Sequence, residues 1–172
     1  MKLDLNLEIL KTPIEAMIKN ALKEAKDIKS KIYLSLAYFQ YINKLSTNKA
    51  IRLFKEYILS DGQKLGYPFS VYYTKDGKLI TKYVEIPLKV DEFLSQFIPE
   101  ISNHKDLVSK ITKSRYIRFV KKHLNMNASD ITAYTLYSMV KDIGIHNLIS
   151  LREHWTLFTR RLLPYLIKNN LA

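Results

Sequence analysis

The sequence contains no cysteine, and this absence excludes several kinds of site at once. Disulfide bonds, thiolate zinc sites and cysteine-ligated iron–sulfur clusters all require cysteine side chains. The four histidines, at positions 104, 123, 146 and 154, do not have the spacing of metal ligands. We therefore expect no cofactor, and this chain can supply no cysteine ligand for an iron–sulfur cluster.

Long apolar runs and glycines are also scarce. No run approaches the roughly 20 apolar residues of a membrane-spanning helix. The first residues, MKLDLNLEILK, lack the apolar centre of a signal peptide. The chain has only 4 glycines, and no phosphate-binding glycine loop stands out among them. We expect a soluble, cytoplasmic protein with no membrane partner.

Residues suited to catalysis are scattered along the chain. No nucleophile stands beside a base, and the nearest approach to a metal-dependent nuclease pattern is Asp61, Asp76, Glu85 and Lys89. Pro87 interrupts that pattern where an acid and a lysine would stand two residues apart. The Arg-His-Arg-Tyr set of a tyrosine recombinase cannot be assembled in order either. We expect the chain to be noncatalytic by itself.

Negative charge is the other feature in short supply. The chain has 28 Lys and Arg against 16 Asp and Glu, a formal net charge of +12. Residues 104–172 hold 12 basic and 4 acidic side chains, a net charge of +8, so the excess is greatest in the C-terminal part. Such a balance favours polyanionic partners, either nucleic acids, nucleotides or an acidic protein surface.

Residues 12–60 predict three consecutive helices. Thr12 and Glu15 have the spacing of a capping box, and Pro13 stands where a helix needs no N–H group. The second helix, expected at residues 31–43, is apolar on nearly every side, which is typical of the central helix of a bundle.

In the middle of the chain, the pattern of apolar residues changes from a helical one to one typical of strands. The third helix is capped by residues 46–48 and ends at residues 60–62, and two β-branched, aromatic segments follow. They flank the turn TKDGK, in which Gly77 can adopt a positive φ, and so predict a hairpin at residues 67–87. Two strands alone are marginal in water, so we expect the hairpin to lie against the helices. Three hairpin residues could either make that contact or form a platform for nucleic acid, and these are Tyr72, Tyr73 and Tyr83.

The C-terminal part predicts further helices. The first is a short helix capped by Asp91 and stopped by Pro99, followed by a helical turn at 107–111 and a helix at 114–124. The next helix is opened by Ser129 or Asp130 and closed by Gly144. The last helix runs from Asn147 to about residue 168. The whole chain, residues 1–172, is expected to form a single domain. Its predicted fold class is α-rich α+β, a helical bundle with one central β-hairpin, divided into a helical part at 12–60, the hairpin at 67–87 and a helical part at 91–169.

Basic residues interleaved with aromatic ones are the strongest functional signal. Backbone phosphates require Lys or Arg, whereas unstacked bases stack on aromatic rings. Arg115, Arg118 and Lys122 are spaced i, i+3 and i+7, which places them on one helix face, although a merely solvated face has the same pattern. Trp155 is a candidate platform or a core residue. The candidate residues for binding nucleotide or nucleic acid are Lys29, Lys31, Arg52, Lys55, Arg115, Arg118, Lys122 and Trp155.

The first three predicted helices also suggest a family. TPIEAMIKNAL, IYLSLAYFQYINKLS and AIRLFKEY, between Thr12 and Tyr57, resemble in order the opening of the C-terminal domain of the large primase subunit of archaea and eukaryotes. Ile14 stands in the place of the first cluster cysteine of that family, and Tyr33 in the place of its arginine. Without cluster cysteines, the sequence resembles a cluster-free, PriX-like noncatalytic subunit of archaeal primase.

The resemblance implies a role in DNA replication. It implies binding of the initiating nucleoside triphosphate or primer end and of a single-stranded DNA template, with the small and large primase subunits as partners. The phosphates would then be met by Lys29, Lys31, Arg52 or Lys55, and the core would be held by packing of Ile14, Leu36, Phe39 and Phe54 in place of a cluster. The alternative is a stand-alone DNA-binding protein of a virus or plasmid, in which the face from Arg115 to Lys122 grips duplex phosphates.

Overall fold

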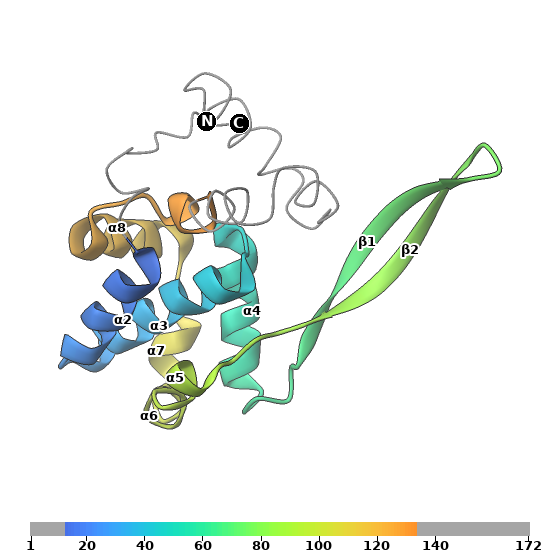
Figure 1. The fold of residues 1–172 in the computed structure, drawn as a ribbon. Coiled ribbons are helices and arrows are strands. Elements are labelled where there is room, and N and C mark those ends of the chain that lie inside the picture. The colour runs from blue at the N-terminus through green and yellow to red at the C-terminus, as the bar shows by residue number, and fades with distance from the viewer. Residues whose placement is uncertain (1–12, 134–172) are drawn as a thin grey trace, which may run out of the picture.

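The computed structural model describes residues 13–133, and within them it gives the backbone alone for residues 69–74, 81–84 and 86. The elements are, in chain order, α2 (Ile14–Glu24), α3 (Ile28–Asn43), α4 (Thr47–Leu59), β1 (Gly66–Lys75), β2 (Lys78–Pro87), α5 (Glu92–Ser95), α6 (Ile98–Ser102), α7 (Lys105–Ser109) and α8 (Lys113–Leu124). Residues 128–133 are helical as well. The described chain is thus an α-rich α+β fold, with a helical bundle and one two-stranded hairpin (Figure 1).

Helix α3 forms the centre of the bundle, as its all-round apolar pattern predicts. Helices α2, α4, α5, α6 and α8 all pack against it. Phe39 of α3 and Phe54 of α4 are fully buried, with ring centroids 5.6 Å apart. Ile14 and Leu36 are buried in the same cluster, so the four residues expected to form the core do so.

Local signals explain where the first helices begin. Asp27 precedes α3 and accepts a hydrogen bond from the Ser30 backbone N–H at 3.0 Å, and Ser46 caps α4 in the same way. The N-cap of α2 is Pro13, which offers no side-chain bond, and the predicted cap Thr12 lies outside the described residues. Glu15 instead pairs with Lys19 at 3.0 Å, one turn along the helix.

The segment after the hairpin contains more helix than the sequence predicted. Asp91 caps α5 as expected, but Pro99 does not stop it, because α5 has already ended at Ser95. Pro99 instead lies in the first turn of α6, where a helix needs no N–H donor. The turn expected at 107–111 is the helix α7, which starts two residues earlier.

The C-terminal predictions fall partly within the described chain. Helix α8 is confirmed, with Thr112 as its cap. The following helical segment begins at residue 128, before the predicted caps Ser129 and Asp130. The predicted stop at Gly144 and the last helix lie outside the described residues.

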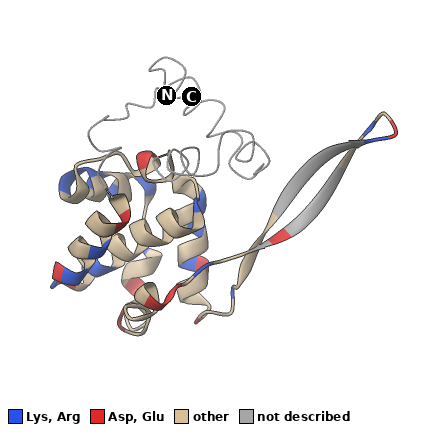
Figure 2. Ribbon diagram, in the orientation of Figure 1, with Lys and Arg blue, Asp and Glu red and all other residues tan. Residues whose placement is uncertain are grey.

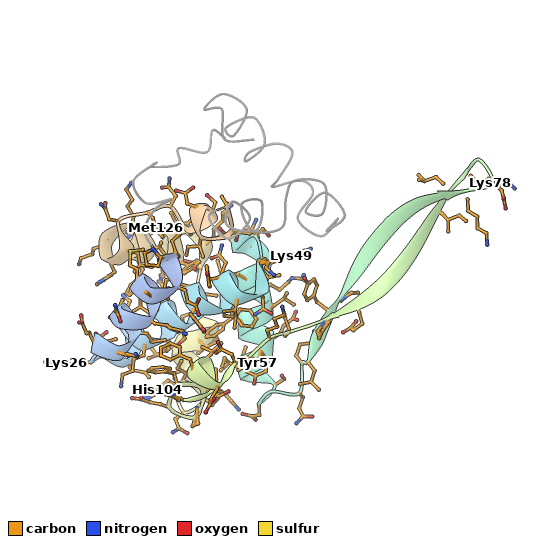
Figure 3. All side chains as sticks on the ribbon, in the orientation of Figure 1. Lys26, Lys49, Tyr57, Lys78, His104 and Met126 are labelled. Atoms are coloured by element: carbon orange, nitrogen blue, oxygen red, sulfur yellow. The ribbon has the colours of Figure 1, made fainter. Side chains whose placement is uncertain are left out.

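The β-hairpin is confirmed, with antiparallel pairing from Gly66 opposite Pro87 to Lys75 opposite Lys78. Gly77 has φ +75° in the turn, a conformation that suits glycine. The ladder stretches away from the helices, and Lys78 lies at its far tip (Figures 1 and 3). Only the base of the hairpin adjoins the bundle, so the expectation that the hairpin lies against the helices is wrong for the rest of its length. The side chains of Tyr72, Tyr73 and Tyr83 lie outside the described ones, so their predicted role is not tested.

Candidate functional site

An open groove of about 790 Å³ runs along the outer face of α4 and reaches the first residue of α8. Small-molecule sites commonly occupy about 300–1,000 Å³, so a nucleotide-sized ligand fits this volume. The groove is lined by Asn48, Ile51, Arg52, Lys55, Glu56, Leu59, Ser60, Lys64 and Lys113.

The periodicity of α4 creates the long wall of this groove. Leu53, Phe54 and Ile58 are buried on the inner face of the helix. Arg52, Lys55 and Leu59 recur at intervals of three or four residues, which places them on one outer stripe. The helix therefore packs into the core on one side and presents cations and an aliphatic side chain on the other.

A tight turn after α4 brings Lys64 into the same groove. Gly62, at φ +78°, lets the chain reverse, and its backbone N–H donates to the Tyr57 carbonyl at 2.9 Å. The Ser60 hydroxyl accepts a hydrogen bond from the Lys64 backbone N–H at 3.1 Å and donates to the same Tyr57 carbonyl at 3.2 Å. Ser60 thus fixes the turn that positions Lys64.

The lining of the groove holds four cationic side chains and one carboxylate, a formal charge of +3. Glu56 lies 3.9 Å from the Lys64 ammonium, but both side chains are well exposed, so their attraction is weak. Lys55 donates to the Ile111 carbonyl at 3.0 Å, and an ammonium group has three donors, so others remain. The side chains of Arg52 and Lys113 have no hydrogen bond or ion pair within residues 13–133, so both can bind an anion.

Lys113 occupies an electrostatically unfavourable position. It is the first residue of α8, and the first turn of this helix carries no acidic side chain. The N-terminus of a helix bears a partial positive charge, which favours Asp or Glu there and disfavours Lys. A residue that breaks such a local rule is often found at a binding site. Together with the helix terminus, Lys113 adds to the positive potential of the groove.

The structure places Arg52 and Lys55 in the groove, but not the other two residues of α3 and α4 that were expected to meet phosphates. Lys31 forms an ion pair with Glu100 of α6, with nitrogen–oxygen distances of 3.0 and 3.2 Å. Lys29 is exposed in the first turn of α3 and does not line the groove. Of the four residues expected to meet phosphates from this part of the chain, Arg52 and Lys55 line the groove, whereas Lys29 and Lys31 do not.

Helix α8 carries the second cationic surface. Arg115, Arg118 and Lys122 are all exposed, and Figure 2 shows basic residues on both α8 and α4. Arg115 donates to the Lys110 carbonyl at 3.3 Å. Trp155, the remaining predicted site residue, lies outside the described residues.

Two groove residues, Lys64 and Lys113, are missing from the sequence-based prediction. They are far apart in the sequence and meet only through the packing of α4, α7 and α8. The cap at Thr112 was a usable signal for Lys113, since it marks Lys113 as a cation in a first helical turn.

Tyr33, which the resemblance would align with an arginine, is a core residue. It is only 5% exposed and its ring stacks on Phe119, with centroids 4.9 Å apart. Burial raises the pKa of its hydroxyl, and the positive charge of Arg115 opposes this effect. Tyr33 therefore offers neither a cation to a phosphate nor an exposed ring to a base.

The acidic residues of the nuclease pattern do not form a site. Asp61 pairs with Lys105 at 2.6 Å, Asp76 lies in the hairpin turn, and Glu85 lies in β2 opposite Pro68. In the described part of the chain, no group of three or more His, Asp or Glu residues could hold a metal ion.

The comparisons with known proteins give no family assignment. Neither the known protein families, nor the curated proteins, nor the solved structures contain a match to this chain. Among residues 13–133, no helix combines the length and the apolarity that crossing a bilayer requires.

Proposed function

We propose that this protein is a noncatalytic subunit of a DNA primase that binds the initiating nucleoside triphosphate or primer end beside a single-stranded template. The observation that carries the proposal is the groove, in which Arg52, Lys55, Lys64 and Lys113 surround a space large enough for a nucleotide. The cations come from α4, the following turn and α8, and so converge on one ligand.

The chemistry of the groove suits a nucleotide with several phosphates. Each added phosphate brings negative charge to a lining with formal charge +3, and Arg52 can bind two phosphate oxygens at once through its planar guanidinium. Ile51 and Leu59 supply an aliphatic surface beside the cations, and Leu59 is 43% exposed. A nucleoside can lie against this surface while its phosphates reach the charged groups.

The arrangement of the first three helices also supports the proposal. Ile14, which replaces the family's first cluster cysteine, is buried next to the core built by Leu36, Phe39 and Phe54. Packing therefore does the work that a cluster would do in that family. Because Tyr33 is buried, the phosphates would be met by side chains of α4, its turn and α8 rather than by the side chain at the arginine position.

Equilibrium titration of the full chain with nucleoside triphosphate and monophosphate tests the binding part of the proposal. We expect the triphosphate to bind at least about tenfold more tightly, since two further phosphates meet cations in the groove. Equal affinity for the two nucleotides would contradict this assignment.

Capture of partners from native extract tests the primase part. The tagged full chain should retain the small and large primase subunits. If both subunits are absent and the chain is recovered bound to DNA without other proteins, the primase assignment fails in favour of the stand-alone alternative.

One observation favours that alternative, a stand-alone DNA-binding protein. Helix α8 carries five Lys and Arg residues and no acidic residue, which suits contact with duplex phosphates. Such a protein would bind duplex DNA at least as tightly as a single strand and would show no preference for triphosphates.

A further inference from the structure

A column of four aromatic rings runs from the protein core to the surface along α3 and α8. Tyr116 stacks on Tyr33 with centroids 6.3 Å apart, Tyr33 on Phe119 at 4.9 Å, and Phe119 on His123 at 4.1 Å. The planes of neighbouring rings differ by 13°, 19° and 26°, so the rings are close to parallel. The column ends at His123, which is exposed to solvent.

The inner end of the column is fixed. Tyr116 is fully buried, and its hydroxyl donates to the Gln40 side-chain carbonyl at 2.7 Å. Gln40 in turn donates to the Ala128 carbonyl at 3.0 Å. The imidazole of His123 stacks on Phe119, which in turn stacks on Tyr33, so one face of the imidazole is already packed against the protein. A ring held in this way loses little conformational entropy when another ring stacks on it.

Cations border this exposed ring. Arg118 and Lys122 lie on the adjoining stripe of α8, and neither side chain has a hydrogen bond or ion pair within the described chain. They are four residues apart, a rise of about 6 Å along the helix, which is close to the spacing of neighbouring phosphates on an extended single strand. The acidic group near His123 is Asp27, whose carboxylate is engaged by the Ser30 backbone N–H and hydroxyl. The phosphates therefore belong on the Arg118 and Lys122 side of the ring.

We propose that His123 is a stacking platform for a base of single-stranded nucleic acid, with Arg118 and Lys122 contacting the adjacent phosphates. The proposal rests on the proposed function, because it assigns the template strand to α8 and leaves the nucleotide to the α4 groove. Stacking accepts any base, since every base has a π-face, so the platform reads no sequence. A duplex cannot use it, because its bases are already stacked on one another and enclosed between two backbones.

Binding of a fluorescein-labelled oligo-dT strand to the full chain, followed by anisotropy, tests the platform. Loss of one stacked base reduces affinity by about five-fold or more, and we expect this loss for His123→Ala. His123→Phe keeps a ring on Phe119 and should stay within about twofold of the unmodified protein, by the same stacking argument. His104→Ala is the matched control, since His104 is half-buried at the start of α7, far from the end of α8 that Met126 marks in Figure 3.

Salt dependence separates stacking from charge. Lys122→Ala should reduce the slope of log K against log salt by about 0.7, the value for one phosphate contact on a single strand. His123→Ala should leave that slope unchanged while lowering affinity at every salt concentration. A strand carrying 2-aminopurine gives a direct reading, because its fluorescence should be quenched by the unmodified protein and by His123→Phe but not by His123→Ala.

The platform is overturned if His123→Ala binds the single strand within twofold of the unmodified protein, or if a duplex of the same length binds as tightly and is equally weakened. Triphosphate binding is measured separately with His123→Ala. If it persists while the strand measurements fail, the nucleotide groove stands and the platform alone is wrong. If the unmodified protein binds neither the strand nor the triphosphate, both proposals fail.

Discussion

The helical body and the β-hairpin are built on different principles. In the body, α2, α4 and α8 bury one face each against α3, and the buried residues form one continuous cluster. The hairpin consists of two strands that pair with each other and extend away from the helices (Figure 1). We therefore expect the outer part of the hairpin to contribute little to the stability of the body or to the α4 groove.

The junction between the two regions is nevertheless well defined. The Asn43 side chain at the end of α3 donates to the Lys89 carbonyl at 3.0 Å and accepts from the Lys89 backbone N–H at 2.6 Å. The Leu88 backbone N–H donates to the Leu65 carbonyl at 2.8 Å, which closes the base of the hairpin. Tyr67 is buried there, and the Lys49 ammonium lies 5.4 Å from its ring centroid. The hairpin is thus attached to the body through its base.

The largest effect is expected in the core of the body. Phe39→Ala removes a fully buried ring that packs on Phe54, and should lower the free energy of unfolding by about 3–5 kcal/mol. Urea titration measures this loss. A loss below about 1 kcal/mol would mean that the site relaxes to fill the space, and would contradict the description of α3 as the central helix.

A smaller effect is expected where polar groups are buried in the same body. Tyr116→Phe removes the donor to the Gln40 carbonyl and leaves that buried oxygen without this bond, at a cost of about 1–3 kcal/mol. The variant keeps the aromatic ring, so the change isolates the hydroxyl group. An unchanged unfolding free energy would indicate that the oxygen finds another partner.

The Tyr116 hydroxyl should also make the stability difference between the unmodified protein and Tyr116→Phe depend on pH. Burial raises the pKa of Tyr116 well above its ordinary value of 10.0, so the folded state holds the proton that the unfolded state releases. The stabilisation is complete below pH 10 and is lost as the pH rises above it. The difference between the unmodified protein and Tyr116→Phe should therefore shrink above pH 10 in urea titrations. A difference that grows in that range would contradict burial of this group.

The smallest effect on stability is expected in the hairpin. Replacing residues 69–84 by Asn-Gly keeps Tyr67 and the base but removes the outer ladder. We expect the free energy of unfolding to change by less than about 1 kcal/mol, because the backbone of the removed part extends away from the helices and a shorter connection closes at no greater entropic cost. A loss of about 3 kcal/mol or more, a value typical of a disrupted core, would show that the hairpin contributes to the body.

The sequence was sufficient for the features that depend on neighbouring residues. The cap within residues 46–48, the helix end at residues 60–62 and Gly77 as a turn residue are each determined within a few positions, and all three are confirmed. The apolar pattern of α3 identified the central helix for the same reason. The direction of the hairpin could not be predicted, because strand pairing does not say what covers either face.

The candidate site was less predictable because it depends on contacts between distant segments. The helical period of α4 places Arg52 and Lys55 on one stripe, so their proximity could be inferred. The pairing of Lys31 with Glu100 and the convergence of Lys64 and Lys113 depend on how α3, α4, α6 and α8 pack, which no local pattern encodes. The i, i+4 spacing of Phe119 and His123 allows their stacking but does not by itself predict it.

The central claim is that the groove on α4 binds nucleotide phosphates. The most direct measurement compares triphosphate affinity in three variants of the full chain, namely Arg52→Ala, Lys26→Ala and the chain with residues 69–84 replaced. Lys26 is exposed on the side of the body away from α4, so Lys26→Ala removes the same charge outside the groove (Figure 3). We expect Arg52→Ala to lose about tenfold or more in affinity, the value of a charge-assisted hydrogen bond, while the other two variants stay within about twofold. Equal losses for Arg52→Ala and Lys26→Ala, or no loss for Arg52→Ala, would contradict the account.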